Sequence, residues 1–181
     1  AKANVALSIT LTTIATLLRA PQRLRAIVAR VRERVPAEIP VTVKVRVGWD
    51  SSDGLEEIAA AAAAGGAAWL TVHARTRAQL YAPPVRWPEL ARARATIAIP
   101  VVANGDLRVP GDLSECAAQS GCHAFMIGRA AMAQPDLFAT VRGEAGAPLS
   151  HSQRMALVRD YHAAMIAAQL LVSTTRLTEG V

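Results

Sequence analysis

The feature that most constrains the fold is a series of four short β-branched segments, each followed by sequence with the pattern of a helix. The strands they predict end near Arg46, His73, Asn104 and Gly128, which lie 27, 31 and 24 positions apart. A gap of this length holds one helix and its loops. The pattern therefore predicts consecutive βα units with right-handed crossovers, and a parallel sheet buried on both faces.

The boundaries of these elements can be read from the residue pattern. In the first strand, valine alternates strictly with Thr42, Lys44 and Arg46, which places the polar residues on one face. Residues 6–18 are apolar and rich in threonine, without clear periodicity, and no element is predicted there. The predicted strands are residues 41–47, 69–73, 99–104 and 124–128, and the predicted helices are residues 22–35, 53–64, 87–94, 112–120 and 152–171.

Parallel βα units can close as a barrel or lie open as a doubly wound sheet. A (β/α)8 barrel needs eight units in about 250 residues, and the chain shows four. No GxGxxG motif follows a predicted strand, which weakens the dinucleotide-binding alternative. The fold class is therefore α/β, and the helical pattern beyond Glu144 indicates the start of a second region.

Composition limits the classes of function. The net charge of +6 comes from eighteen arginines and two lysines against 14 acidic residues. This excess fits a solvated basic face as well as a surface that attracts phosphate or nucleic acid. No apolar stretch is long enough to span a bilayer, and no signal peptide is seen. Cys116 and Cys122 lack zinc-site spacing and are predicted to be packing residues of a cytoplasmic protein.

Polar and glycine residues gather where the predicted strands end, which is where (β/α) barrels carry their active sites. Glycines there let backbone N–H groups approach a phosphate. The pattern predicts one phosphorylated ligand with a part that a lysine and a histidine can hydrogen-bond. A redox flavin fits these demands, and a phosphosugar remains an alternative. The residues at the four strand ends are Lys44 and Arg46, then His73 and Arg75, then Asn104, Gly105 and Asp106, then Gly128 and Arg129.

Several of these segments resemble the tRNA-dihydrouridine synthase family. Residues 41–50 read VTVKVRVGWD, similar to the family's VTVKxRxGWD. Residues 72–77 (VHARTR) and 79–81 (QLY) are similar to VHGRT and QxY. Residues 99–106 (IPVVANGD) and 121–129 (GCHAFMIGR) are similar to IPVIANGD and GCDAVMIGRG. The resemblance covers residues 20–145 and continues weakly to about residue 170. The Trp-Asp pair favours a bacterial subgroup.

The resemblance implies a fold and an activity. The fold would be the second half (strands 5–8) of an FMN-binding TIM (β/α)8 barrel at residues 1–145, with residues 1–20 atypical. Residues 146–181 would begin a helical tRNA-binding domain. NADPH would reduce FMN, and the flavin would pass hydride to C6 of a tRNA uridine, giving 5,6-dihydrouridine. The FMN contacts would be Lys44, His73, Asn104, Gly105, Asp106, Gly128 and Arg129, and the RNA contacts Arg46, Arg75 and Tyr81. The full-length protein is expected to be a monomer.

The chain also departs from the family pattern. The family's proton-donating cysteine lies in an NxGCP segment, and neither Cys116 nor Cys122 matches it. We therefore expect that the chain begins just after that segment, and that it is inactive alone. Two alternatives stay open: another FMN barrel acting on a small molecule, and a tRNA-binding remnant without catalysis.

Overall fold

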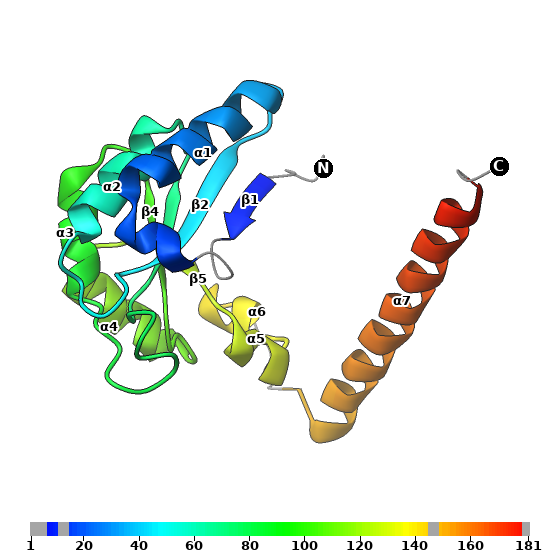
Figure 1. Ribbon diagram of the computed structural model, residues 1–181. Coiled ribbons are helices and arrows are strands. Elements are labelled where there is room, and N and C mark those ends of the chain that lie inside the picture. Colours follow the sequence, from blue (N-terminus) through cyan, green and yellow to red (C-terminus); the bar gives the residue numbers. More distant parts are fainter. Residues whose placement is uncertain (1–6, 11–14, 145–148, 179–181) are drawn as a thin grey trace. The chain divides into compact units, whose positions relative to one another are not determined.

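The computed structural model describes residues 7–10, 15–144 and 149–178 of the chain. The chain divides into two compact units, Ala1–Gly128 and Arg129–Val181. The first unit holds a five-stranded sheet in which every pairing is parallel and strand order follows chain order (Figure 1). The strands are β1 (Leu7–Thr10), β2 (Val41–Arg46), β3 (Leu70–His73), β4 (Val101–Asn104) and β5 (Ala124–Met126).

Helices connect successive strands and pack side by side on one face of this sheet. Helix α1 packs on α2, α2 on α3, and α3 on α4 (Figure 1). This row follows from right-handed crossovers that all return on the same side of the strands. The helices are α1 (Pro21–Arg34), α2 (Leu55–Ala64), α3 (Glu89–Thr96) and α4 (Pro110–Ser120), and a short 3-10 helix, η1 (Ala15–Arg19), precedes α1.

The strand register separates an apolar face from a polar one. Val45 pairs with Val72, and Val72 with Ala103, and all three side chains are buried. One residue further along, Arg46 pairs with His73, and His73 with Asn104. The predicted alternation in the first strand is thus confirmed. The predicted burial of both faces is confirmed for β3, all four residues of which are buried, whereas Lys44, Arg46 and Asn104 on the polar face of β2 and β4 stay partly exposed.

One strand of the first unit was not predicted from the sequence. β1 lies within the threonine-rich stretch for which no element was predicted, and Thr10 pairs with Lys44. The part of the chain that the structure describes therefore holds five parallel strands and not four. The predicted strands and helices are otherwise confirmed, with ends that differ by a few residues.

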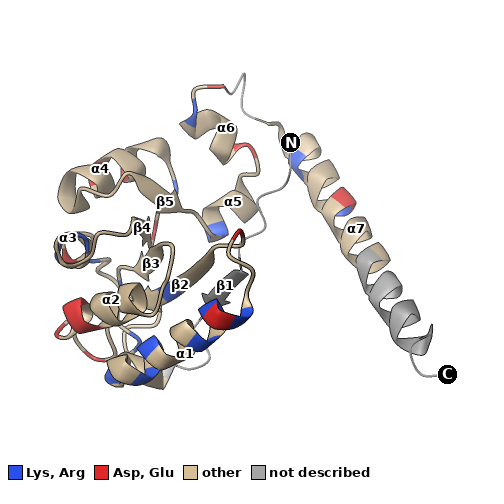
Figure 2. Cartoon of the chain, turned by 90° about the horizontal axis from the view of Figure 1, so that it is seen from above, with Lys and Arg blue, Asp and Glu red and all other residues tan. Residues whose placement is uncertain are grey.

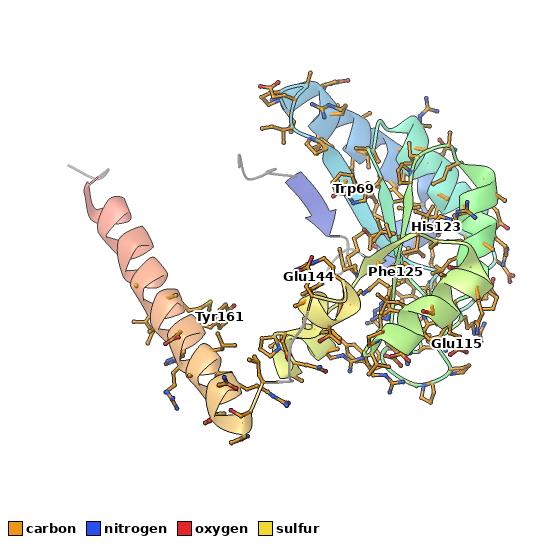
Figure 3. All side chains as sticks on the ribbon, turned by 180° about the vertical axis from the view of Figure 1, so that it is seen from behind. Trp69, Glu115, His123, Phe125, Glu144 and Tyr161 are labelled. Carbon is orange, nitrogen blue, oxygen red and sulfur yellow. The ribbon has the colours of Figure 1, made fainter. Side chains whose placement is uncertain are left out.

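The second unit is helical. It contains α5 (Arg129–Ala133), α6 (Leu137–Val141) and the long α7 (His151–Thr178), which confirms the helix predicted at residues 152–171. The Asp136 carboxylate accepts a hydrogen bond from the backbone N–H of Leu149, 3.2 Å away. Tyr161 projects from α7 and is 67% exposed (Figure 3). The division after Gly128 lies earlier than the predicted boundary at residue 145, and the assignment of residues 146–181 to a tRNA-binding domain stays a prediction.

Among the described residues, no helix combines the length and the apolar character needed to cross a bilayer.

Candidate functional site

Lys44 lies on the polar face of the sheet, in the middle of β2, between Thr10 of β1 and Thr71 of β3. Its side chain is half-buried. Burial, and then the positive charge of Arg46, lower the pKa of the Lys44 ammonium below its usual value. Among the described residues, no hydrogen bond or ion pair engages this ammonium. A desolvated cation without a partner is a group that favours an anionic or electron-rich ligand.

His73 ends β3 two register positions beyond Lys44, and therefore on the same face of the sheet. It is 8% exposed, and neither ring nitrogen hydrogen-bonds within the described residues. Burial above all, and then the charges of Arg46 and Lys44, lower the pKa of His73 to about 4, although Asp106 opposes the shift. At neutral pH the ring is therefore uncharged, with one nitrogen that donates and one that accepts.

The depressed pKa of His73 predicts a pH dependence of stability. The folded state holds the ring neutral down to about pH 4, whereas the unfolded chain protonates it near pH 6.5. The stabilisation is thus complete above pH 6.5 and is lost as the pH falls towards 4. The loss should reach about 3 kcal/mol of unfolding free energy at most.

Chemical denaturation of the wild type and of His73→Gln between pH 7 and pH 4 measures this dependence. The two curves should differ in slope across the window, because only the wild type carries the shifted group. Parallel curves would show that His73 titrates normally in the folded protein.

The third strand end forms a turn that packs against His73. Gly105 has a φ of +122° and Asp106 a φ of +50°, so both backbones are left-handed. A Cβ built on Gly105 would lie 2.9 Å from Cδ2 of His73, which leaves room only for glycine. The indole N–H of Trp87 donates to the Gly105 carbonyl at 2.9 Å, and the Asn104 amide N–H donates to the Met126 carbonyl at 2.7 Å. The turn is therefore fixed from both sides.

Arg75 is buried beneath this turn, with 2% of its surface exposed. Its guanidinium donates two parallel hydrogen bonds to the Asp106 carboxylate, at 2.9 and 2.6 Å. A third, from Nε, reaches the Ala82 carbonyl at 2.8 Å. The predicted RNA contact through Arg75 disagrees with this geometry, because a buried guanidinium already engaged by a carboxylate offers no surface to a phosphate.

Arg46 is the last residue of β2, and Tyr81 lies in the loop after β3. One guanidinium nitrogen of Arg46 donates to the carbonyls of Thr76 and Leu80, each at 2.9 Å. The Tyr81 ring lies 6.0 Å from the Arg46 guanidinium carbon and is 63% exposed. The structure thus brings these two predicted RNA contacts together, with an aromatic face open to solvent.

Gly128 and Arg129 fall on either side of the division between the two units. A Cβ on Gly128 would meet no atom within 4 Å, and Arg129 is the first residue of α5. Their predicted contact with a phosphate stays a prediction.

The two cysteines are packing residues, as predicted. Cys116 lies in α4 and Cys122 precedes β5, and both are buried. Burial raises the pKa of the Cys116 thiol to about 11 and also raises that of Cys122. Neither thiol has the character of a proton donor or nucleophile at neutral pH.

Sequence reasoning missed two tryptophans that shape the site. Trp87 was assigned only to a helix start, yet its indole holds the Gly105 turn. Trp49 was used only as a subgroup marker, yet its ring lies beneath two arginine side chains. A signal was present for Trp49, because a tryptophan directly after a strand end is out of place in a solvated loop.

A parallel sheet with helices on one face and polar residues at successive strand ends has the architecture of (β/α)-barrel enzymes. The family described as dihydrouridine synthase (Dus) matches residues 13–176. The chain belongs to this family.

Curated relatives agree with this assignment. The chain is 39% identical over 162 residues to the tRNA-dihydrouridine(16) synthase of Pseudomonas syringae, covering 87% of this chain and 51% of the relative. It is 47% identical over 129 residues to the enzyme of the same name from Cupriavidus necator, covering 71% of this chain and 40% of the relative. Both organisms are bacteria, as the Trp-Asp pair predicted. The chain spans about half the length of these relatives.

A solved structure supports the fold alone. Dihydrodipicolinate synthase from Aquifex aeolicus matches with a TM-score of 0.51 at 12% identity, covering 81% of this chain and 51% of that chain. The match places the chain among parallel α/β folds of the TIM-barrel type.

Proposed function

We propose that this chain is the cofactor-holding part of a tRNA-dihydrouridine synthase that reduces uridine 16 of tRNA, with FMN as cofactor and NADPH as reductant. The position in the tRNA follows the names of the relatives. The observation that carries the proposal is the pair Lys44 and His73, two polar side chains on one face of the sheet that have no hydrogen-bond partner among the described residues, in a member of this family.

The residues of this chain fit both ends of FMN, the flavin ring and the phosphate. Lys44 and the neutral His73 suit the flavin ring, which carries carbonyl acceptors and gains negative charge on reduction. The turn at Gly105 and Asp106 suits the phosphate, because a left-handed backbone without a Cβ lets N–H groups approach an anion. The Asp106 carboxylate does not oppose an anion there, because Arg75 neutralises it.

When bound, the flavin supplies the hydride for the reduction of uridine. Within this chain, Lys44 would hold the flavin ring and would supply a positive charge that favours negative charge on the ring. His73 contributes one N–H and carries no charge of its own at neutral pH. Proton donation to the base is assigned to a group other than Cys116 and Cys122, because both thiols are buried with raised pKa values.

The tRNA substrate has to present its uridine out of the stack, because the reacting carbons are inaccessible within stacked RNA. Arg46 and the exposed ring of Tyr81 form a cation and an aromatic face at the carboxyl edge of the sheet. Such a pair suits an unstacked base and its backbone. We assign the RNA contacts to Arg46 and Tyr81, and we assign Arg75 to positioning Asp106.

The place of this chain in a whole barrel follows from strand order. We propose that β2–β5 are the last four strands of an eight-stranded barrel and that β1 is the strand before them. Residues 146–181 would then begin a helical tRNA-binding domain. The whole protein is proposed to be a cytoplasmic monomer.

Replacing Lys44 with methionine should weaken FMN binding about 10- to 100-fold, because a charge-assisted contact is worth about 1.5–3 kcal/mol. Quenching of FMN fluorescence on titration with the chain gives the dissociation constant. Arg34→Met removes a charge from the exposed last turn of α1 and is the matched control. Equal affinities of Lys44→Met and the wild type would remove Lys44 from the cofactor site.

The substrate is tested separately, in the organism that carries the gene. Disruption of the gene should abolish dihydrouridine at position 16 of its tRNA, measured by mass spectrometry of purified tRNA. Unchanged dihydrouridine at this position would overturn the proposed activity.

A further inference from the structure

A stack of two arginines on one tryptophan stands at the rim of the sheet, where the loops after β2 and β3 meet. The Arg19 guanidinium carbon lies 4.4 Å from the Trp49 ring centroid, and that of Arg77 lies 5.6 Å from it. Two backbone bonds join the loops beneath them: Arg77 donates to the Gly48 carbonyl and Ala78 to the Trp49 carbonyl, each at 2.8 Å. The Trp49 stack, as we call Arg19, Trp49 and Arg77, is therefore built on a fixed base.

The charge of the Trp49 stack is only partly balanced. Asp50 pairs with Arg19 at 2.8 Å, but both side chains are more than half exposed, at 67% and 60%. Such an exposed pair is weak and gives way to a stronger anion. No carboxylate among the described residues forms an ion pair with Arg77. The stack thus presents two cations against one loosely held carboxylate.

The surroundings of the stack add positive charge. Burial is the main cause that lowers the pKa of Arg46; Tyr81 opposes the shift, and the charges of Arg77 and Arg75 add to it, so these guanidiniums repel one another in the folded protein. Their mutual repulsion would be relieved by an anion bound among them. Trp49 follows β2, the strand of Lys44, and Arg77 follows β3, which ends at His73, so the stack lies at the same edge of the sheet as the candidate site.

The chemistry of stacked guanidiniums decides which anion fits. An arginine lying on an indole keeps its N–H edge free, and that edge matches the oxygens of a phosphate. Two such edges held by one ring suit two neighbouring phosphates of a polynucleotide better than a single small anion. Because Trp49 already restricts the Arg19 and Arg77 side chains, they lose less conformational entropy when they bind an anion.

We propose that Trp49 holds Arg19 and Arg77 as a clamp for consecutive backbone phosphates of the RNA substrate, beside the entrance to the Lys44 and His73 site. This proposal rests on the proposed function and assigns it an additional binding surface. The clamp adds affinity for tRNA and positions the RNA backbone along the protein, and it does not recognise the identity of the base.

The test measures binding of an unmodified tRNA transcript to the full chain by fluorescence anisotropy, at salt concentrations from about 50 to 200 mM. Replacing both Arg19 and Arg77 with alanine should lower the slope of log K against log salt by about two, and weaken binding at least about tenfold at the lower salt. Asp50→Asn should tighten binding several-fold, because the competing carboxylate is removed.

Two controls separate the clamp from the proposed function. Arg34→Ala removes an exposed charge from the last turn of α1, a helix with several basic residues (Figure 2), and should leave both slope and affinity near those of the wild type. FMN affinity, measured in the same samples, should be the same in all variants. If the wild type binds tRNA, and the Arg19 and Arg77 double variant has the same affinity and salt slope as Arg34→Ala, the clamp alone is overturned. A wild-type chain that binds neither FMN nor tRNA would overturn the proposed function and the clamp with it.

Discussion

Replacing Arg75 with methionine should lower the unfolding free energy by about 3 kcal/mol, because the variant leaves the Asp106 carboxylate and the Ala82 carbonyl without their donor. Asp106 keeps 24% side-chain exposure, so water compensates part of the loss. The change should also weaken FMN binding, because Asp106, in the left-handed turn, loses the guanidinium that neutralises its carboxylate and holds it in place.

Guanidinium denaturation and an FMN titration measure the two effects of this variant. Arg75→Lys keeps the charge but loses the planar fork, and we expect it to recover only part of the stability. Arg92→Met is the matched control, because Arg92 also pairs with carboxylates, those of Glu56 and Glu89, but its side chain is 39% exposed, so its loss should cost less than that of Arg75. A variant at Arg75 that is as stable as the one at Arg92 would contradict the structural role given to this arginine.

Replacing Gly105 with alanine should cost about 2–4 kcal/mol and displace the His73 ring. Two causes act together: a φ of +122° strains a residue with a Cβ, and that Cβ would lie 2.9 Å from His73 Cδ2 and 3.0 Å from Val85 Cγ2. Because the ring is part of the proposed flavin site, FMN affinity should fall along with stability.

Gly111→Ala provides the matched control for Gly105. Gly111 lies in the first turn of α4, and a Cβ there would meet no atom within 4 Å. The same chemical change should therefore leave FMN binding unaltered and raise stability by up to about 1 kcal/mol through helix propensity. Equal stability losses in the two variants would show that the close packing of His73 on Gly105 does not make a Cβ at position 105 destabilising.

The local pattern of the sequence accounts for much of the fold. Alternating valines in residues 41–47 predicted both the strand and its polar face, since a period of two is specific to a pleated strand. β1 was missed because Leu7–Thr10 is only 4 residues long and lies in apolar sequence that shows no wider period. Its identity as a strand comes from pairing with β2, which is a tertiary interaction.

The candidate site was predictable in its composition but not in the roles of its residues. Lys44 and His73 were recognised because polar residues at successive strand ends converge in parallel folds. The burial of Arg75 could not be foreseen, because an arginine in a loop is most often exposed. Only its pairing with Asp106, 31 positions away, makes it a structural residue.

We propose that the carboxyl edge of this sheet holds FMN between Lys44, His73 and the Gly105 turn. Proton–nitrogen correlation spectra of the chain during titration with FMN test it most directly. Signals of His73, Asn104 and Gly105 should shift together with one dissociation constant, while those of Val41 at the opposite end of β2 stay in place. Riboflavin, which lacks the phosphate, should shift the His73 signals and leave the Gly105 signal nearly unmoved. Saturating FMN that shifts none of these signals, or shifts only residues far from this edge, would contradict the account.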